Sequence, residues 1–246
     1  MSSGHRHAEP KTPAELSRML GEGDTPDLLA RAVRIDTTRD VPYAGGISAD
    51  GKTVYIDRRL HAEVMAGDVR VRGIAPKELI GAWIEHEHTE WSVDAGDNPV
   101  DSYGAAHAYA SAKENERYET LGRNPDSVNE TTDAAIDRCV KRDPVNPPKD
   151  LWCGPYHDTA FTDDGPDGKR AKELLRMFRA RGVVDAFKES KIAVHYGMGP
   201  DKCANCVHFG RDTAIRKALG NGDIAPCEIV CGLVRADRDC DRYQEN

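Results

Sequence analysis

The sequence contains no long hydrophobic run. Hydrophobic residues make up 39% of the 246 residues and aromatic residues 6%, whereas 31% are charged, so we expect a modest core. No segment approaches the roughly 20 apolar residues of a membrane-spanning helix, and the N-terminal region has no apolar signal-peptide core. We therefore expect a cytoplasmic protein, or one associated with a virion, that has no membrane partner.

An excess of positive charge is also missing. The formal net charge is -8 at pH 7, and the basic residues are scattered among acidic ones. Proteins that bind nucleic acid generally need a basic surface that neutralises phosphates. The sequence therefore argues against nucleic acid as a general partner, and it leaves a peptide substrate or an unidentified protein as the expected partner.

Cysteine is scarce in most of the chain but concentrated near the C-terminus. Cys203, Cys206, Cys227 and Cys240 lie in a short stretch, punctuated by Gly and Pro, that is too small to build much of a core. The two-residue gap lets the first pair reach one metal centre, which the two later cysteines complete. Four-cysteine zinc ribbons normally have two Cys-x-x-Cys pairs. The wide separation of the second pair therefore favours an iron-sulfur cluster.

This stretch resembles the high-potential iron-sulfur proteins. That family has a Tyr, a Cys-Ala-x-Cys-x-x-Phe segment, a later Cys, a Gly-x-Val stretch and a last Cys followed by an aromatic residue. The matching residues are Tyr196, Cys203, Cys206, Phe209, Cys227, Gly232, Val234, Cys240 and Tyr243. The resemblance implies that the four cysteines bind one [4Fe-4S] cluster and that the three aromatic residues of this set shield it from water.

The match to this family has two departures. Cys231 stands where the family usually has Pro, which makes it a candidate alternate ligand, and Arg238-Asp239 replaces the usual Gly-Trp. Solvent exposure and nearby charge change the potential of a cluster. A structural cluster that supplies folding energy therefore stays open beside a redox role. Disulfides are a further alternative, although seven cysteines is an odd number and no export signal is visible.

A second set of metal-binding side chains, Glu85-His-Glu-His-Thr-Glu90, lies in a helix predicted from Pro76 to about Val93. His86 and Glu90 are four residues apart, so they project from one face of that helix. This is the spacing of the zinc-protease His-Glu-x-x-His helix with Glu in the second His position. Glu87 is then placed to act as the general base.

The surrounding sequence resembles small zincin metallopeptidases and a group of phage-type proteins. A predicted strand at residues 51–57 precedes the metal-binding helix, and a Tyr-x-x-Ala-His helix begins at Tyr103, as in the phage-type group. His107 and Glu114 of this second helix are seven residues apart and share a face, so either is a candidate third ligand. His107 is favoured because two imidazoles and one carboxylate form a common catalytic zinc shell.

Two other interpretations of the metal-binding helix stay open. Its Glu85, Glu87 and His88 side chains would form an ordinary solvated face if the opposite face is buried. Alternatively, Glu85-x-x-His88 is the signature of ferritin-like di-iron sites, with Glu114 bridging from the next helix, although such a site needs two of these motifs.

The predicted fold class is α+β, with a mostly helical zincin-like domain that includes a small hairpin, and a small irregular iron-sulfur domain. The hairpin is expected at residues 43–57, with its turn at Asp50-Gly51. Breaks rich in Pro and Gly divide the chain. The expected segments are a polar, partly flexible stretch at 1–40, a zincin-like domain at 41–142, a linker at 143–168, and a helix with the iron-sulfur domain at 169–246.

The predicted function is that of a metal-dependent, peptidase-like hydrolase. Its ligands would be His86, Glu90 and His107, with Zn²⁺ as the expected ion, and a [4Fe-4S] cluster would occupy the C-terminal domain. Two alternatives belong to other classes of protein. One is a non-enzymatic, phage-type structural or assembly protein, and the other is a one-electron carrier.

Overall fold

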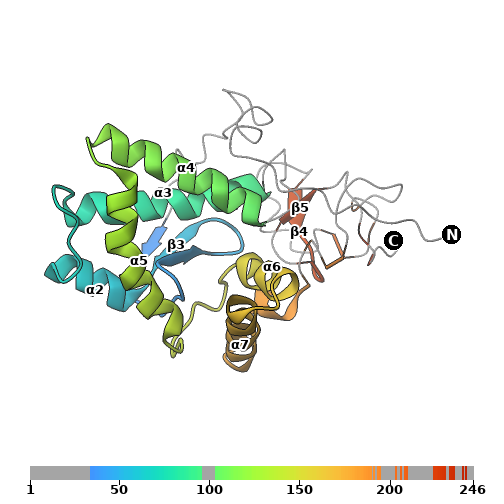
Figure 1. The fold of residues 1–246 in the computed structure, drawn as a ribbon. Helices are drawn as coiled ribbons and strands as arrows, with labels where there is room; N and C mark the ends of the chain where they lie inside the picture. Colours follow the sequence, from blue (N-terminus) through green and yellow to red (C-terminus); the bar gives the residue numbers. More distant parts are fainter. Residues whose placement is uncertain are drawn as a thin grey trace.

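The described part of the chain is mostly helical. The computed structural model describes residues 34–95 and 103–189, and then shorter pieces at 191, 193–194, 203, 206, 208–209, 224–230, 233–235, 240 and 242. Over these residues, six α-helices accompany a three-stranded and a two-stranded sheet (Figure 1). This mixture agrees with the predicted α+β class. None of the described helices is long and apolar enough to span a membrane.

The three-stranded sheet has the order β1-β3-β2. Strands β1 (Arg34–Asp36) and β3 (Thr53–Ile56) are parallel, and β2 (Gly45–Ile47) pairs with β3 in the antiparallel direction. The predicted hairpin is therefore confirmed, whereas β1 lies within the segment expected to be polar and partly flexible. Strand β2 forms one edge of this sheet, next to the helices described below.

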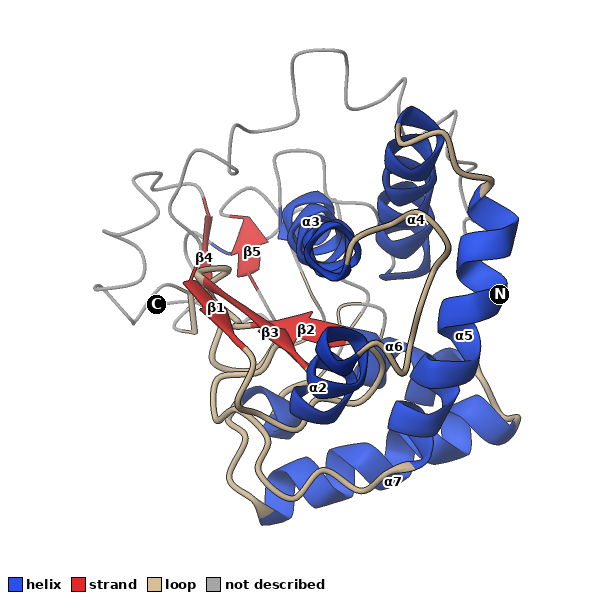
Figure 2. Ribbon diagram, turned by 90° about the vertical axis from the view of Figure 1, so that its left-hand side faces the viewer, coloured by secondary structure: helices blue, strands red, loops and turns tan. Residues whose placement is uncertain are grey.

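Helices α2 and α3 follow the sheet. Helix α2 (Arg58–Ala66) is capped by Asp57, whose carboxylate accepts hydrogen bonds from the N–H groups of Arg59 and Leu60. It ends at Gly67, which adopts the left-handed conformation. Helix α3 (Pro76–Ala95) begins at a proline, as the sequence predicts. It lies along one face of the sheet, while α2 lies toward the other (Figure 2).

Helices α4 (Tyr103–Thr120) and α5 (Pro125–Lys141) follow α3 along the chain. Helix α4 packs along α3, and α5 then crosses toward α2 (Figure 1). Asn124 caps α5 through the N–H of Asp126, with proline at the first helical position. Helix α4 begins at Tyr103, as the sequence predicts.

The segment 143–168, expected to be a linker, contains helix α6 (Gly154–Thr162) and the start of α7 (Pro166–Ala180). Its Leu151, Trp152 and Tyr156 side chains belong to the main core. The main chain here continues the edge of the sheet, because the Trp152 N–H donates to the Ile47 carbonyl at 2.8 Å. The Pro-rich sequence therefore connects packed elements, and the division of the chain into domains stays a prediction.

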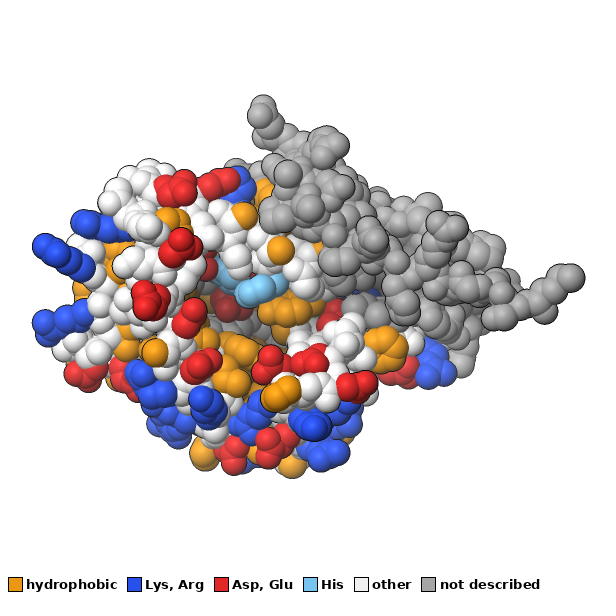
Figure 3. Space-filling model, viewed as in Figure 1, with side chains coloured by type: hydrophobic (Ala, Val, Ile, Leu, Met, Phe, Trp, Pro, Cys, Tyr) orange, Lys and Arg blue, Asp and Glu red, His pale blue; other side chains and the backbone are white. Residues whose placement is uncertain are grey.

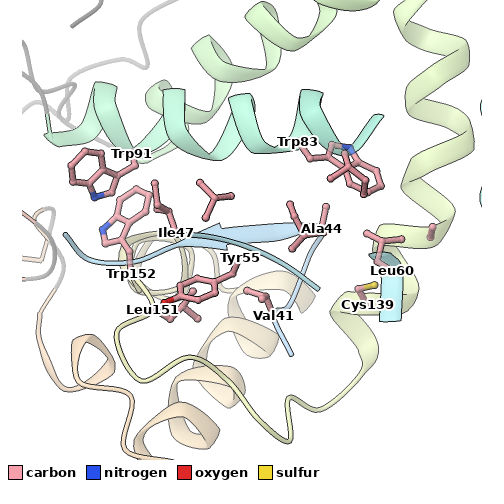
Figure 4. Close-up of a cluster of buried hydrophobic side chains, with 14 of the residues drawn as sticks. Val41, Ala44, Ile47, Tyr55, Leu60, Trp83, Trp91, Cys139, Leu151 and Trp152 are labelled. Carbon is pink, nitrogen blue, oxygen red and sulfur yellow. The ribbon is translucent and has the colours of Figure 1, made fainter. Parts of the chain in front are cut away.

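The main core extends from the α3 side of the sheet to its other side, where Val41, Tyr55 and Leu151 lie (Figure 4). Trp83 and Trp91 extend from α3 toward the strands, Trp83 at the end of the cluster near Ala44 and Trp91 at the end near Ile47 and Trp152. These side chains are buried. Trp91 also covers the hairpin turn, because a Cβ atom at Gly51 would lie 2.3 Å from its ring. This packing holds α3 in a fixed position over the sheet.

The C-terminal region carries strands β4 (Ile224–Pro226) and β5 (Leu233–Arg235), which are antiparallel. A short 3-10 helix at Asp185–Phe187 follows α7 and precedes this region. Lys191 makes a buried ion pair of 2.8 Å with Asp94 near the end of α3. The C-terminal region is therefore joined directly to the helix that carries the His and Glu cluster.

Candidate metal centre

Two adjacent helices carry the residues of the candidate metal centre. Helix α3 holds His86, Glu87 and Glu90, and helix α4 holds His107 and Glu114. The four-residue spacing of His86 and Glu90 places both on one face of α3. This face meets α4, because the His107 ring contacts the Glu90 carboxylate.

The donor atoms of His86, Glu90 and His107 form one tight group. His107 Nδ1 lies 2.8 Å from Glu90 Oε2 and 3.3 Å from His86 Nε2, and His86 Nε2 lies 3.4 Å from Glu90 Oε2. Tetrahedral zinc with bonds of about 2.0–2.1 Å holds its ligand atoms about 3.3 Å apart. The three atoms therefore have nearly the spacing of a zinc shell, and they have its nitrogen and oxygen chemistry. The described part of the chain contains no other such group of His, Cys, Asp or Glu side chains.

The group is buried on one side and open on the other. The Glu90 side chain is 4% exposed and the His86 side chain 11%, whereas the His107 side chain is 50% exposed. A catalytic zinc site has three protein ligands and keeps one position open for water or substrate. The exposure of His107 leaves space for such a position.

Glu114 contacts the opposite side of the His86 ring. Its Oε2 lies 2.8 Å from His86 Nδ1, and its Oε1 accepts a hydrogen bond of 2.5 Å from the Tyr118 hydroxyl. Metal-binding histidines commonly donate their second N–H to a carboxylate, which fixes the orientation of the ring. Of the two candidate third ligands, His107 therefore joins His86 and Glu90, and Glu114 lies behind His86.

The carboxylates of the centre stabilise positive charge. Burial alone would lower the pKa of His86, but the Glu114 and Glu90 carboxylates outweigh it and hold this pKa well above its ordinary value. Burial would likewise raise the pKa of Glu90, yet the contacts with His107 and His86 lower it. Burial acts in the same way on Glu114, whose pKa is lowered chiefly by His86. An environment of this kind also favours a metal cation.

Glu87 follows His86 on α3 and lines the cavity beside the centre. Its side chain lies against β2, where a Cβ atom at Gly45 would come within 3.1 Å of Glu87 Oε1. Burial and then repulsion from Glu90 raise the pKa of Glu87 to about 8, although His86 opposes this shift. A carboxyl group with this pKa is suited to exchange protons near neutral pH.

A cavity of about 350 Å³ adjoins the metal centre. Figure 3 shows histidine side chains at a hollow in the surface, with hydrophobic and acidic side chains around it. One group of lining residues, here called the aromatic wall, comprises Tyr43, Tyr103, Trp152 and Tyr156. The Tyr103 hydroxyl lies 3.4 Å from His107 Nδ1, so the aromatic wall begins at the metal centre.

Glu85 and His88, the residues of the di-iron alternative, do not join this group. Glu85 contacts Arg117, and His88 is buried with its ring centre 6.5 Å from that of Trp91. Burial also lowers the pKa of His88. The face that carries His88 is therefore not solvated at this residue. The metal-binding geometry of the described helices lies on the opposite side, around His86.

The four C-terminal cysteines belong to a second apolar cluster. Cys203, Cys206 and Cys227 are buried within it, and Cys240 packs against it. Its other members are Val194, Phe209, Val230 and Val234, with Ile229 partly buried beside them. A bridge between Phe209 and Cys227 brings the first cysteine pair next to the later segment. None of the six described cysteines takes part in a disulfide. Tyr196, Cys231 and Tyr243 lie outside the described residues.

Comparisons of this chain with protein-family models, with curated proteins and with solved structures found no match. The functional argument therefore depends on the geometry of the two sites described above.

Proposed function

We propose that this protein is a metal-dependent hydrolase that acts on peptides, with Zn²⁺ held by His86, Glu90 and His107. The observation that carries the proposal is the mutual spacing of three donor atoms, 2.8, 3.3 and 3.4 Å, next to an open cavity. Two imidazoles and one carboxylate match the donor set of catalytic zinc sites.

Each group of the site has a part in hydrolysis. A Zn²⁺ ion bound there would act as a Lewis acid toward a carbonyl group and toward water. Glu87 accepts the proton of the attacking water and passes it to the leaving amine. Burial holds the pKa of Tyr103 well above its ordinary value. Its hydroxyl therefore stays protonated and donates a hydrogen bond to the oxygen that gains negative charge.

The edge strand β2 supports a peptide as the substrate. Ala44 and Ser48 hydrogen-bond with the β3 side, so the main chain of Gly45 faces outward between them. Within the described residues no hydrogen bond occupies Gly45 on that side, whereas the Ile47 carbonyl is taken by Trp152. An extended peptide can add to a sheet edge through such main-chain groups. Gly45 is buried, so a peptide would reach it only through the cavity. Gly45 also lines the cavity, so a peptide bound there would pass Glu87.

The test of this proposal is the Glu87→Gln variant, assayed with the zinc-loaded full chain on labelled denatured casein. The variant should keep its zinc and lose turnover by about 10²- to 10⁴-fold, because amide cannot accept the proton. Glu85→Gln is the matched control on the same helix, and it should retain both zinc and turnover. Equal turnover of the Glu87→Gln variant and the parent chain would refute the role of Glu87.

For the C-terminal region we propose one [4Fe-4S] cluster bound by Cys203, Cys206, Cys227 and Cys240. The support is that three of the four are buried in one apolar cluster with Phe209 and three valines, and that Cys240 packs against this cluster. After anaerobic purification, about four irons and four sulfides per chain are expected. The Cys206→Ser variant should lose them, and zinc in place of iron in the parent chain would contradict the cluster.

A second candidate function is that of a non-enzymatic, phage-type assembly protein. The observation that favours it is the burial of the cysteines among apolar side chains, which suits a cluster whose role is to stabilise the fold. In that case, removal of metal should unfold the C-terminal region and abolish partner binding, with no substrate turned over. Reversible one-electron cycling of the cluster would instead indicate an electron carrier.

A further inference from the structure

We infer that the cavity beside the metal centre selects a positively charged residue, Lys or Arg, next to the bond that is cut. This inference rests on the proposed function and names its substrate class. It comes from two independent features of the cavity, namely the charge of the lining and the aromatic wall.

The charged side chains that line the cavity are acidic. They are Glu87, Glu90, Glu114 and Asp133, and none of the described lining residues is a lysine or arginine. Two arginines outside the lining are engaged in ion pairs, because Arg117 contacts Glu85 and Arg170 pairs with Asp143 and Glu173. A divalent ion offsets the carboxylates of Glu90 and Glu114, and the Asp133 carboxylate remains. The loaded cavity therefore keeps negative charge.

Asp133 is the lining carboxylate that stands apart from the metal centre. It lies on α5, is exposed, and does not belong to the His86 group. Because it is not grouped with the donor atoms of the metal centre, this carboxylate is available to a charged group of the substrate. A substrate with a carboxylate next to the cut bond would meet repulsion from it, whereas a lysine or arginine would be attracted.

The aromatic wall provides the second feature. Tyr103 connects the metal centre to the wall, with its ring centre 5.5 Å from that of His107 and 6.4 Å from that of Trp152. Tyr43 and Tyr156 continue it, with ring centres 6.0 Å apart. Aromatic faces bind cations, and the long apolar stems of Lys and Arg pack on such surfaces.

The backbone of Tyr43 is held in an uncommon conformation that places its ring in this wall. Its φ angle is +65°, which is unusual for a residue other than glycine. Such strain persists where the surrounding structure fixes it, and it is frequent at binding sites. Aromatic surface alone would accept any apolar residue, so it is the combination with acidic lining that specifies a cation.

The test measures binding of three ligands that differ in charge and not in the group that chelates the metal. These are the hydroxamates of Nα-acetyl lysine, norleucine and glutamate, titrated calorimetrically into the zinc-loaded full chain. The lysine ligand should bind about tenfold more tightly than the glutamate ligand, with norleucine between them. Asp133→Asn should reduce this ratio severalfold. Asp137→Asn, an exposed aspartate of the same helix outside the lining, should leave it unchanged.

The outcomes separate this inference from the proposed function. Equal affinities for the three ligands, or tighter binding of the glutamate ligand, would overturn the charge selection and leave the hydrolase proposal in place. A ratio that Asp133→Asn does not change would also overturn it. Failure of the chain to load zinc, or to bind any hydroxamate, would overturn both.

Discussion

Gly45 of β2 lies against the carboxylate of Glu87 on α3. A Cβ atom at position 45 would approach Glu87 Oε1 and Cγ to 3.1 Å and the Tyr55 carbonyl oxygen to 2.9 Å. The edge strand and the metal-binding helix therefore meet at a residue without a side chain. This close approach fixes the position of the proposed base beside the sheet edge where a peptide would bind.

Gly45→Ala should displace the Glu87 carboxylate while the three metal ligands stay in place. We expect retained zinc and a loss of kcat/KM of up to about a hundredfold, since small misplacement of a catalytic group is costly. Activity per zinc-loaded chain is the measurement. Gly81→Ala on α3, whose new methyl group would meet only the flexible Arg117 side chain at 3.3 Å, is the control. Full activity of Gly45→Ala would show that Glu87 does not need this contact.

The hydrogen bonds that the Glu114 carboxylate accepts from the Tyr118 hydroxyl and from the His86 ring should set the metal affinity. Glu114→Gln is expected to weaken zinc binding by about tenfold to a hundredfold, and Tyr118→Phe by less, because both loosen the orientation of His86. Competition with a chromophoric chelator measures this affinity. Tyr109→Phe, which changes another buried tyrosine of α4, should have no effect. A Glu114→Gln variant that binds zinc like the parent chain would contradict this role of Glu114.

Gly51→Ala should destabilise the fold without touching the metal centre. Gly51 has a φ angle of +71°, and its missing Cβ would lie 2.3 to 2.5 Å from ring atoms of Trp91. We expect the free energy of unfolding to fall by about 1–3 kcal/mol from backbone strain, with a further loss where Trp91 must move. Urea denaturation checks this. Gly104→Ala, with no atom within 4 Å of the new methyl group, should be neutral or slightly stabilising.

An ion-pair cluster between α2 and α5 should make stability depend on acid pH. Arg142 and Arg138 bind the two oxygens of Glu63 at 2.9 and 2.8 Å and lower its pKa. The contribution of these ion pairs to the free energy of unfolding is complete above the ordinary pKa of Glu, about 4.3. It is lost as the pH falls through the lowered pKa of Glu63 in the folded state. Glu63→Gln should therefore cost about 1 kcal/mol or less at neutral pH, since the pair is near the surface.

The difference in free energy of unfolding between the Glu63→Gln variant and the parent chain should shrink as the pH falls through the lowered pKa of Glu63. Urea denaturation at a series of pH values measures it. Glu130→Gln, an exposed glutamate of α5, is the control and should show no such trend. A Glu63→Gln penalty that stays constant through the acid range would contradict the ion-pair account.

Much of the fold follows from local sequence signals. The hairpin turn at Asp50-Gly51 and the proline at the start of α3 are short-range features, and both elements form where they are predicted. The sequence does not predict helix α6, because this helix has only nine residues and follows a Pro-rich segment. Its packing depends on the core, in which Trp152 and Tyr156 are buried. Tertiary contacts of this kind are not visible in a local pattern.

Local spacing likewise predicts only part of the candidate site. His86 and Glu90 share a helix face, so their spacing alone indicates that they meet. The choice between His107 and Glu114 could not be made from spacing, because both lie on one face of α4, and it depends on how α4 packs against α3. Tyr118 gave no signal, since its role appears only through the Glu114 carboxylate.

X-ray diffraction at the zinc absorption edge, from crystals of the full chain grown with Zn²⁺, tests the central claim most directly. The account predicts an anomalous-difference peak bounded by His86 Nε2, Glu90 Oε2 and His107 Nδ1. A zinc-containing crystal with no peak at this position, or with the ion held by Glu85 and His88 instead, would contradict it.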